Sequence, residues 1–344
     1  MVRVLVAEDS AVTREYLMHI LSQDPTLEVT GAARNGLEAV AQVERLRPDV
    51  VLMDIHMPGM DGYDATKRIM ERAPTPIVMV SSVLSHDEIA MTFKALEAGA
   101  LTVLNKPDGP GHPGSARASV HIRETVKLMA SVKVVHRWPK RSPPAFPPLP
   151  PIRKTRSKAR LIALGASTGG PTVMAEILAD LPGSLPIPIL AVQHIAPGFV
   201  SGLAEWLAHN TLLRVKLAED GESTRAGTVY LAPSGSQMGI SRDSRIRLTG
   251  GPAEQEFCPS ISHLFQSVAE SFGSSAIGVL LSGMGQDGAA GLMELDRTGG
   301  VTVAQDEDTC VIFGMPGEAV RLGAAQYVLP PRQISELLRS LIIE

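Results

Sequence analysis

The chain has 344 residues, enough for two domains of ordinary size. Hydrophobic residues make up 44% and charged residues 20%, which is typical of a globular protein and excludes a disordered or fibrous chain. The formal net charge of −4 gives no reason to expect nucleic acid as a partner. No apolar run has the length of a membrane span, and the N-terminal segment runs into Glu8 and Asp9, so we expect a cytoplasmic protein without membrane insertion. The two cysteines, Cys258 and Cys310, are too few for a disulfide framework or a metal site.

A basic, proline-rich segment marks the joint between two halves. Residues 133–160 contain nine Lys or Arg and no Asp or Glu, and seven prolines lie between Pro139 and Pro151. Such a segment favours extended polyproline II, so we expect a semi-stiff, solvated spacer; docking to an acidic partner or to an aromatic-lined groove is the alternative. The sequence therefore divides into a first domain, a helical tail with a linker, and a second domain, at residues 1–122, 123–158 and 159–344.

The first half alternates short apolar runs with amphipathic stretches. Five runs of mainly Val, Ile and Leu lie at residues 2–7, 29–33, 50–53, 77–80 and 101–104. Strands this uniformly apolar are buried on both faces, and the intervals between them suit crossover helices. We therefore predict a doubly wound α/β domain with a five-stranded parallel sheet.

Polar side chains follow four of these runs at their carboxyl ends, where such sheets bind ligands. They are Glu8, Asp9, Asp54, Ser81 and Lys106. A solvated strand end would explain any one of them, but converging carboxylates need a cation, and Mg²⁺ prefers such oxygen ligands. A carboxylate beside Mg²⁺ can accept a phosphoryl group while a lysine offsets charge. We predict that Glu8, Asp9 and Asp54 hold the metal. Asp54 is then the expected phosphorylation site, and Ser81 and Lys106 sense the product.

This half resembles a response-regulator receiver domain. The resemblance rests on Val-Ala-Glu-Asp-Ser, Leu-Met-Asp-Ile-His-Met-Pro-Gly-Met-Asp-Gly and Asn-Lys-Pro at residues 6–10, 52–62 and 105–107. It implies a flavodoxin-like fold, Mg²⁺ as cofactor and phosphorylation of Asp54 by a histidine kinase. Two positions depart from the common pattern. Glu8 stands where Asp is usual and reaches the metal through a longer arm, and Val103 replaces an aromatic switch residue, which puts the usual coupling to Ser81 in doubt.

The second half opens with an apolar run that ends in a glycine-rich turn. Residues 161–164 lead into Gly-Ala-Ser-Thr-Gly-Gly-Pro at 165–171, followed by a helical stretch. A phosphate cradle is one interpretation, but a dinucleotide site needs an acid after the next strand, where this chain has Gln193 and His194. The other interpretation makes Ser167 a nucleophile, because flanking glycines allow the sharp turn that exposes its hydroxyl.

Two more strand ends carry partners for this serine. His194 follows the run at 189–192, and Asp287 follows the run at 277–281 within a glycine-rich turn. If these strands are neighbours, Ser167, His194 and Asp287 meet at one sheet edge as a catalytic triad. Their chain order differs from that of α/β-hydrolases, which implies a different fold rather than an absent triad. Ser260, Ser262 and His263 lie on an expected helix and do not follow a strand, so we do not expect them at the site.

Attack of a serine on a carbonyl group also needs hydrogen-bond donors for the oxyanion. The candidate donors are backbone N–H groups beside Ser167 and in the turn that precedes Asp287. They belong to Thr168, Gly169, Met284 and Gly285.

This half resembles the chemotaxis protein-glutamate methylesterase family. The matching segments lie at residues 165–170, 192–199, 218–222, 230–233, 282–291 and 313–316. The resemblance implies a doubly wound α/β domain that hydrolyses glutamate γ-methyl esters on chemoreceptors, releases methanol, and also deamidates receptor glutamines. It places the catalytic roles on Ser167, His194 and Asp287 with no cofactor. Combined with the receiver half, it implies activation by phosphorylation, which we expect to uncover the Ser167 cleft.

One segment departs from this family. Where Arg-Pro-Ser-Val-Asp is typical, the chain has Cys-Pro-Ser-Ile-Ser at residues 258–262, which removes one charge of each sign. We expect altered substrate choice or rate. The alternative function is a phosphorylation-dependent binding module with a decayed esterase site, which titrates phosphoryl groups from a kinase. The presence of Ser167, His194 and Asp287 argues against it.

Overall fold

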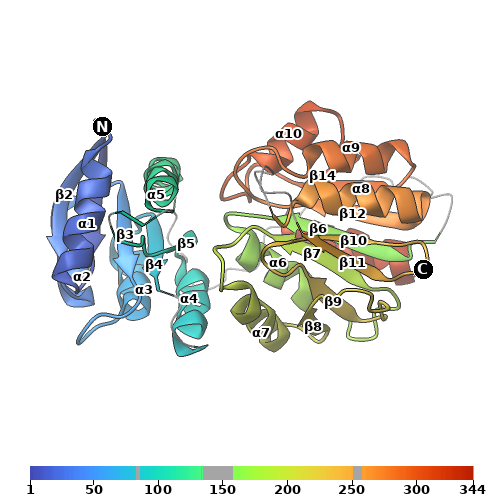
Figure 1. Cartoon of the computed structure of the whole chain (residues 1–344), viewed down its shortest axis with the longest axis horizontal. Helices are drawn as coiled ribbons and strands as arrows, with labels where there is room; N and C mark the ends of the chain where they lie inside the picture. The colour runs from blue at the N-terminus through green and yellow to red at the C-terminus, as the bar shows by residue number, and fades with distance from the viewer. Residues whose placement is uncertain are drawn as a thin grey trace. The chain divides into compact units, whose positions relative to one another are not determined.

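The computed structural model describes residues 1–82, 86–109, 111–112, 114–132, 134, 158–250 and 258–343. The chain forms two compact units, Met1–Ala145 and Phe146–Glu344, each built on its own parallel sheet (Figure 1). Most of the predicted linker, from residue 135 to 157, lies outside the described residues. Among the described helices, none is both long enough and apolar enough to cross a membrane.

The first unit contains the predicted five-stranded parallel sheet. Its strands pair in the order β2-β1-β3-β4-β5. They are β1 (Val2–Ala7), β2 (Leu27–Ala33), β3 (Val50–Asp54), β4 (Ile77–Ser81) and β5 (Thr102–Asn105). Every residue of β3 and β4 is buried, because helices cover both faces of the sheet. This strand order is the flavodoxin-like one, which confirms the predicted fold.

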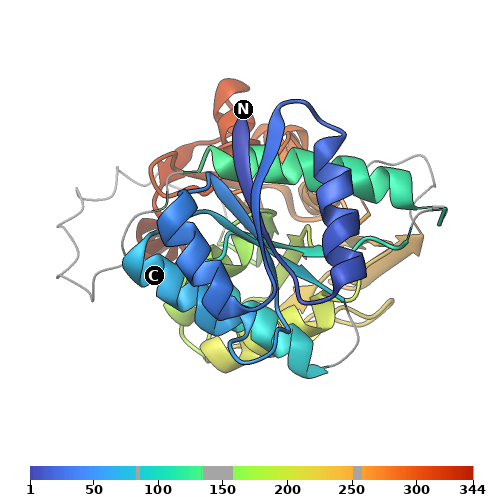
Figure 2. The same cartoon turned by 90° about the vertical axis from the view of Figure 1, so that its left-hand side faces the viewer.

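Five helices cover this sheet. They are α1 (Ala11–Ser22), α2 (Gly36–Leu46), α3 (Gly62–Arg72), α4 (His86–Ala98) and α5 (Ser115–Ala130). Helices α1 and α5 lie side by side on one face, and α2, α3 and α4 follow one another on the other face (Figures 1 and 2). Capping side chains of Ser10, Asn35 and Asp61 begin three of them. Helix α5 runs through the predicted domain boundary at residue 122.

The second unit has a seven-stranded parallel sheet in the order β14-β13-β12-β6-β7-β9-β8. Its strands are β6 (Leu161–Ala166), β7 (Ile189–Gln193), β8 (Arg214–Leu217), β9 (Thr228–Leu231), β12 (Ala276–Leu280), β13 (Val301–Gln305) and β14 (Tyr327–Leu329). A separate antiparallel hairpin, β10 (Ser236–Ile240) and β11 (Ile246–Gly250), packs on α8 (Ile261–Phe272).

Helices again cover both faces of the sheet. Helices α8, α9 (Ala289–Arg297) and α10 (Met315–Arg321) pack together on one face, and α6 (Gly170–Ala179), α7 (Val200–Asn210) and α11 (Pro331–Ile343) pack on the other (Figure 1). A single 3-10 turn (Gly273–Ser275) follows α8. The core between sheet and helices holds Tyr230, Leu264 and Phe265. This arrangement confirms the predicted doubly wound domain.

Each sheet has a point at which its winding reverses. In the first unit the chain winds outward from β1 to β2 and, in the opposite direction, from β3 to β4. In the second unit it winds from β6 to β7 and, in the opposite direction, from β12 to β13. Helices on either side of such a point cover opposite faces and leave a crevice at the carboxyl ends of the strands, where ligands bind. Both predicted sites lie at these two points.

Candidate phosphorylation site and active site

The first site lies at the crevice between β1 and β3. Glu8 follows β1 and Asp54 ends β3, and both side chains are buried, whereas Asp9 is exposed. Carboxylate oxygens of Glu8, Asp9 and Asp54 lie within 4.8 Å of one another. The structure therefore brings together the three residues predicted to hold a metal.

Lys106 is the cation that pairs with the buried carboxylates. Its Nζ lies 3.0 Å from Oδ1 of Asp54 and 3.0 Å from Oε2 of Glu8. Burial, with the nearby charge of Asp54, raises the pKa of Glu8 to about 7. Burial also raises the pKa of Asp54 above its ordinary value, although Lys106 opposes that shift. One lysine therefore does not offset the negative charge of the three carboxylates.

The donor set fits Mg²⁺. Oδ2 of Asp54 is buried and accepts no hydrogen bond from the described residues. A buried carboxylate oxygen without a partner is costly unless a cation or a transferred group uses it. An all-oxygen set of carboxylates with space for water is the coordination that Mg²⁺ prefers.

Ser81 borders this site through its main chain. Its carbonyl accepts a hydrogen bond of 2.9 Å from the N–H of Lys106, and its hydroxyl donates to the carbonyl of Ser82 at 3.4 Å. Val103 is buried in β5 opposite Met79. With valine at this position, no aromatic rotamer is available to couple to Ser81.

The second site is built on the turn after β6. The N–H of Ser167 donates to the carbonyl of Ser282 at 3.0 Å, which holds the turn against the end of β12. The carbonyl of Ser167 accepts from the N–H of Gly170 at 2.8 Å, where α6 begins. Gly169 has a φ of +77°, a conformation that favours glycine, so the glycine-rich turn has the sharp geometry predicted from the sequence.

His194 and Asp287 meet beside this turn. Nε2 of His194 lies 3.0 Å from Oδ2 of Asp287, and the two side chains are 13% and 7% exposed. The N–H of His194 donates to the carbonyl of Ala166 at 2.9 Å, so His194 follows β7 directly beside the residue that precedes Ser167. Because β12, β6 and β7 are neighbours, the three predicted residues lie in segments that follow adjacent strands, and Asp287 lies in the glycine-rich turn beyond β12.

The carboxylate of Asp287 caps the N-terminus of α8. Oδ1 accepts from the Ser260 hydroxyl at 3.0 Å, from the Ser262 N–H at 3.0 Å and from the Gly288 N–H at 2.9 Å, and Oδ2 accepts from the Ile261 N–H at 2.7 Å. Burial alone would raise the pKa of Asp287, but contacts with His194, Ser262 and Ile261 hold it below its ordinary value. A negative charge is also favoured at a helix N-terminus.

The prediction that α8 keeps its polar residues away from the site is wrong for Ser260 and Ser262. Ser260 is the N-cap of α8, where its hydroxyl accepts from the N–H of His263 and donates to Asp287. The hydroxyl of Ser262 accepts from the N–H of Gly288 at 2.7 Å. The N-terminus of α8 lies at the site, so its first residues contact Asp287 although they do not follow a strand. A Ser three residues before a helical N–H is a capping pattern, but it does not reveal which carboxylate the helix meets.

The glycine turn after β12 packs directly against Ser167. A Cβ added at Gly283 would lie 2.6 Å from the Cβ of Ser167 and 2.4 Å from the terminal methyl of Met315. Within the described residues, no backbone hydrogen bond uses the N–H groups of the predicted oxyanion donors Thr168, Gly169, Met284 and Gly285. No competing backbone acceptor among the described residues therefore occupies these candidate donors.

Gln193 connects the two halves of the site and was not predicted. Its Nε2 donates to the carbonyl of Ser167 at 2.7 Å and to the carbonyl of His194 at 2.8 Å. Its side chain is 5% exposed. A Cβ added at Gly170 would lie 2.4 Å from Oε1 of Gln193, so a glycine there makes room for the amide. The only sequence signal is a polar residue at the end of an otherwise apolar strand.

Fold and site together define a class of protein in which a flavodoxin-like domain with an acidic site precedes a doubly wound α/β domain that carries serine, histidine and aspartate beyond neighbouring strands. Comparisons with known proteins agree. The CheB methylesterase family matches residues 162–338, and the response regulator receiver domain family matches residues 4–112. The chain therefore belongs to the CheB methylesterase family.

Relatives match the chain over its full length. A protein-glutamate methylesterase/protein-glutamine glutaminase from Geobacter metallireducens is 49% identical over 100% of both chains. One of the same name from Syntrophus aciditrophicus is 47% identical over 98% of this chain and 97% of its own. The crystal structure of the Thermotoga maritima CheB methylesterase catalytic domain is 37% identical, covers 54% of this chain and 100% of its own, and gives a TM-score of 0.52.

Proposed function

We propose that this protein hydrolyses glutamate γ-methyl esters on chemoreceptors, releases methanol, deamidates receptor glutamines by the same chemistry, and is activated by phosphorylation of Asp54. The contact of His194 with Asp287 beside the turn of Ser167 carries the proposal, in a chain whose full-length relatives are named protein-glutamate methylesterase/protein-glutamine glutaminase. The receiver unit supplies the phosphorylation site.

The esterase chemistry follows from the side chains in the crevice. The Ser167 hydroxyl attacks the ester carbonyl while His194 takes its proton and then delivers it to the departing methoxide. Because Nε2 of His194 faces Asp287, Nδ1 is the nitrogen that exchanges the proton. Water, activated by the same imidazole, then releases the acyl group as glutamate. With a glutamine carboxamide the leaving group is ammonia.

The surroundings of Asp287 and Ser167 serve this sequence of steps. Asp287 stays ionised because donors surround its carboxylate, so it holds the imidazole in one tautomer and stabilises its charged form. The N–H groups of Thr168, Gly169, Met284 and Gly285 are the candidate donors to the oxyanion. In other hydrolases, the loss of one such donor costs about 3 kcal/mol. The esterase steps use side chains and water, so we propose that they need no cofactor.

The receiver unit performs a separate phosphoryl transfer. Oδ2 of Asp54 attacks phosphorus, and the bond to the histidine of a chemotaxis histidine kinase breaks. Glu8, Asp9 and Asp54 would hold Mg²⁺, which offsets the charge on the transferred phosphoryl group when it is bound. Lys106 would pair with the acylphosphate, and Ser81 with one of its oxygens, in place of their present contacts.

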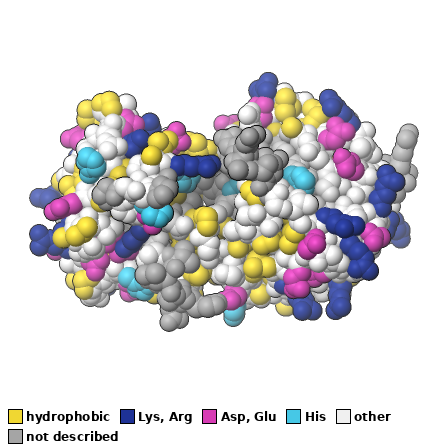
Figure 3. Space-filling model, viewed as in Figure 1, with side chains coloured by type: hydrophobic (Ala, Val, Ile, Leu, Met, Phe, Trp, Pro, Cys, Tyr) yellow, Lys and Arg dark blue, Asp and Glu magenta, His cyan; other side chains and the backbone are white. Residues whose placement is uncertain are grey.

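The partners follow from these two reactions. They are methylated chemoreceptors as substrates and a histidine kinase as phosphoryl donor, both met in the cytoplasm. We propose no nucleic-acid partner, because the net charge is −4 and basic and acidic side chains of the described residues are interspersed on the face shown in Figure 3.

The test is methanol release from methylated receptors by the whole protein, with and without a small phosphodonor. The proposal expects release that depends on Ser167 and rises when Asp54 is phosphorylated. Phosphorylation without any methanol or ammonia release would favour the alternative, a binding module that titrates phosphoryl groups.

A further inference from the structure

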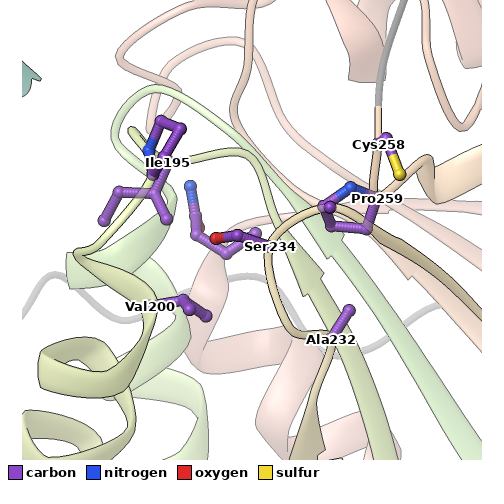
Figure 4. Close-up of a pocket in the computed structure, with 9 residues that line it drawn as sticks. Ile195, Val200, Ala232, Ser234, Cys258 and Pro259 are labelled. Atoms are coloured by element: carbon purple, nitrogen blue, oxygen red, sulfur yellow. The ribbon is translucent and has the colours of Figure 1, made fainter. Parts of the chain in front are cut away.

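A cavity of about 320 Å³ opens beside the candidate active site, within the second unit (Figure 4). Three segments line it: the stretch from the end of β7 to the start of α7, the stretch after β9, and the residues before α8. Its lining residues are Gln193, Ile195, Pro197, Val200, Ala232, Ser234, Gly235, Cys258 and Pro259. In Figure 4, Ile195 and Val200 lie on one side, Cys258 and Pro259 on the opposite side, and Ser234 between them.

The walls of this cavity are continuous with the candidate triad. Gln193 precedes His194, and its amide donates to the carbonyls of Ser167 and His194. On the other wall, Pro259 precedes Ser260, whose hydroxyl donates to Asp287. In the sheet order β12-β6-β7-β9, the glycine turn after β12 flanks Ser167 on one side and the cavity lies on the other.

The cavity is chemically neutral. None of its nine lining residues carries a charge, and five of them present only carbon side chains. Val200 and Ala232 are buried, so their surfaces form walls and not an outer rim. The polar groups are the Ser234 hydroxyl, the Cys258 thiol and the Gln193 amide, whose N–H groups already have acceptors and whose Oε1 accepts no hydrogen bond from the described residues. An acidic group placed here would lose its hydration and meet no cation among the lining side chains, whereas an apolar group would be buried favourably.

We propose that this cavity is a substrate subsite for an uncharged, apolar side chain of the receptor segment that carries the methylated glutamate, with Cys258 as a specificity-determining residue. The proposal rests on the proposed function. A glutamyl side chain is short. When its ester carbonyl lies against Ser167, the residues beside that glutamate in the receptor therefore lie over the protein surface next to Ser167. The cavity is the concave part of that surface.

Cys258 sets the charge of the subsite. The two ends of the segment at 258–262 lie in different surroundings. Cys258 lines the cavity, whereas Ser262 contacts Asp287 and Gly288 in the site itself. An arginine at 258 would place a cation on the cavity wall and favour an acidic neighbour in the receptor. With cysteine, the same wall favours an apolar one.

The test compares γ-methyl glutamate peptides that differ only in having leucine or glutamate on both sides of the ester. For the full-length, phosphorylated protein we expect kcat/KM to be about tenfold higher for the leucine peptide. Cys258→Arg should abolish or reverse this preference, and Cys258→Ser, the matched neutral control, should keep it. A single-residue γ-methyl glutamate ester without neighbours should be hydrolysed equally by all three proteins, which also shows that each of them is folded.

A labelling experiment gives a second readout that does not require turnover. Burial and the nearby charge of Asp306 raise the pKa of Cys310 to about 12, which lowers its reactivity at neutral pH, so a thiol reagent there labels Cys258 preferentially. In a Ser167→Ala protein, which keeps the ester intact, the leucine peptide should slow the labelling of Cys258 and the glutamate peptide should not.

Three outcomes are distinguishable. If the unmodified protein hydrolyses both peptides equally and neither peptide protects Cys258, the subsite is refuted while the proposed function stands. If Cys258→Arg slows the single-residue ester as much as the peptides, the cavity holds the ester group itself and the subsite proposal is wrong. If no substrate releases methanol, the proposed function is refuted, and the subsite proposal, which rests on it, is refuted with it.

Discussion

The hydroxyl of Ser260 donates a hydrogen bond of 3.0 Å to Oδ1 of Asp287 while accepting one from the N–H of His263. A single side chain thus caps helix α8 and orients the carboxylate that faces His194. The catalytic aspartate of this proposal is fixed by a helix N-terminus, although the three proposed catalytic residues themselves come from strand ends.

Ser260→Ala removes one charge-assisted donor from Asp287. Such a bond contributes about 1.5 kcal/mol or more, so we expect kcat for methanol release to fall about tenfold with little change in KM. The pKa of Asp287 should rise, because its ionised carboxylate loses a donor. Ser260→Thr keeps the hydroxyl and should restore most of the rate. An identical kcat in Ser260→Ala and the unmodified protein would show that this hydrogen bond has no catalytic role.

Gln193→Met removes the donor that joins the carbonyls of Ser167 and His194. We expect kcat to fall between tenfold and a hundredfold, roughly the effect of about 1 kcal/mol for each of two bonds plus misplacement of the serine. Gln326→Met is the matched control, since the Gln326 amide also joins two acceptors, Asp296 and Gly300, on other elements of the same unit. Both variants should lose comparable thermal stability. Equal losses of kcat in the two would mean that Gln193 is merely structural.

Gly283→Ala introduces a Cβ only 2.6 Å from the Cβ of Ser167. Backbone must shift at the nucleophile, so we expect at least about a hundredfold loss of esterase activity. Gly250→Ala is the control, because a Cβ there meets nothing within 4 Å. Phosphorylation of Asp54, measured with a radiolabelled small phosphodonor, should be unchanged in both. Full esterase activity in Gly283→Ala would contradict the close packing of this turn on Ser167.

Glu8 makes the receiver unit sensitive to pH when Mg²⁺ is removed. Its pKa is raised to about 7, so the folded state holds a proton that the unfolded state loses near pH 4.5. The free energy that protonated Glu8 contributes to folding is therefore fully present below about pH 4.5. It is lost as the pH rises through 7, which lowers the free energy of unfolding by up to about 3 kcal/mol. In EDTA at pH 7.5, Glu8→Gln should unfold at a higher temperature than the unmodified protein. The difference should shrink at pH 5.

Addition of Mg²⁺ provides the complementary measurement. It should stabilise the receiver transition of the unmodified protein and have a smaller effect on Glu8→Gln, since one of three ligands has lost its charge. Calorimetry of the full chain follows both transitions. If Glu8→Gln gains no stability in EDTA, ionised Glu8 does not destabilise the metal-free unit. If the variant responds to Mg²⁺ as strongly as the unmodified protein, Glu8 is not a metal ligand.

The residues at strand ends could be predicted because parallel sheets follow a general rule. Uniformly apolar runs identify the strands, and polar residues that follow them must gather at one edge, which is how Asp54, Lys106, Ser167 and His194 were found. The same rule does not identify contacts between elements distant in sequence. Which helix N-terminus meets Asp287 depends on how α8 packs, and no local pattern contains that information.

Gln193 and the cavity lie beyond sequence prediction for a similar reason. A glutamine at a strand end indicates only that a polar group is tolerated there, and its two acceptors become visible once β6 and β7 are paired. The cavity has walls from three separate segments, so it exists only in the folded unit.

The most direct test of the central claim is to measure methanol release from methylated receptors by the phosphorylated full-length Ser167→Ala, His194→Ala and Asp287→Ala variants. We predict that each loses nearly all activity, about a thousandfold or more, while Asp54 is phosphorylated at the normal rate. Substantial methanol release by Ser167→Ala would contradict the assignment of the nucleophile and, with it, the proposed active site.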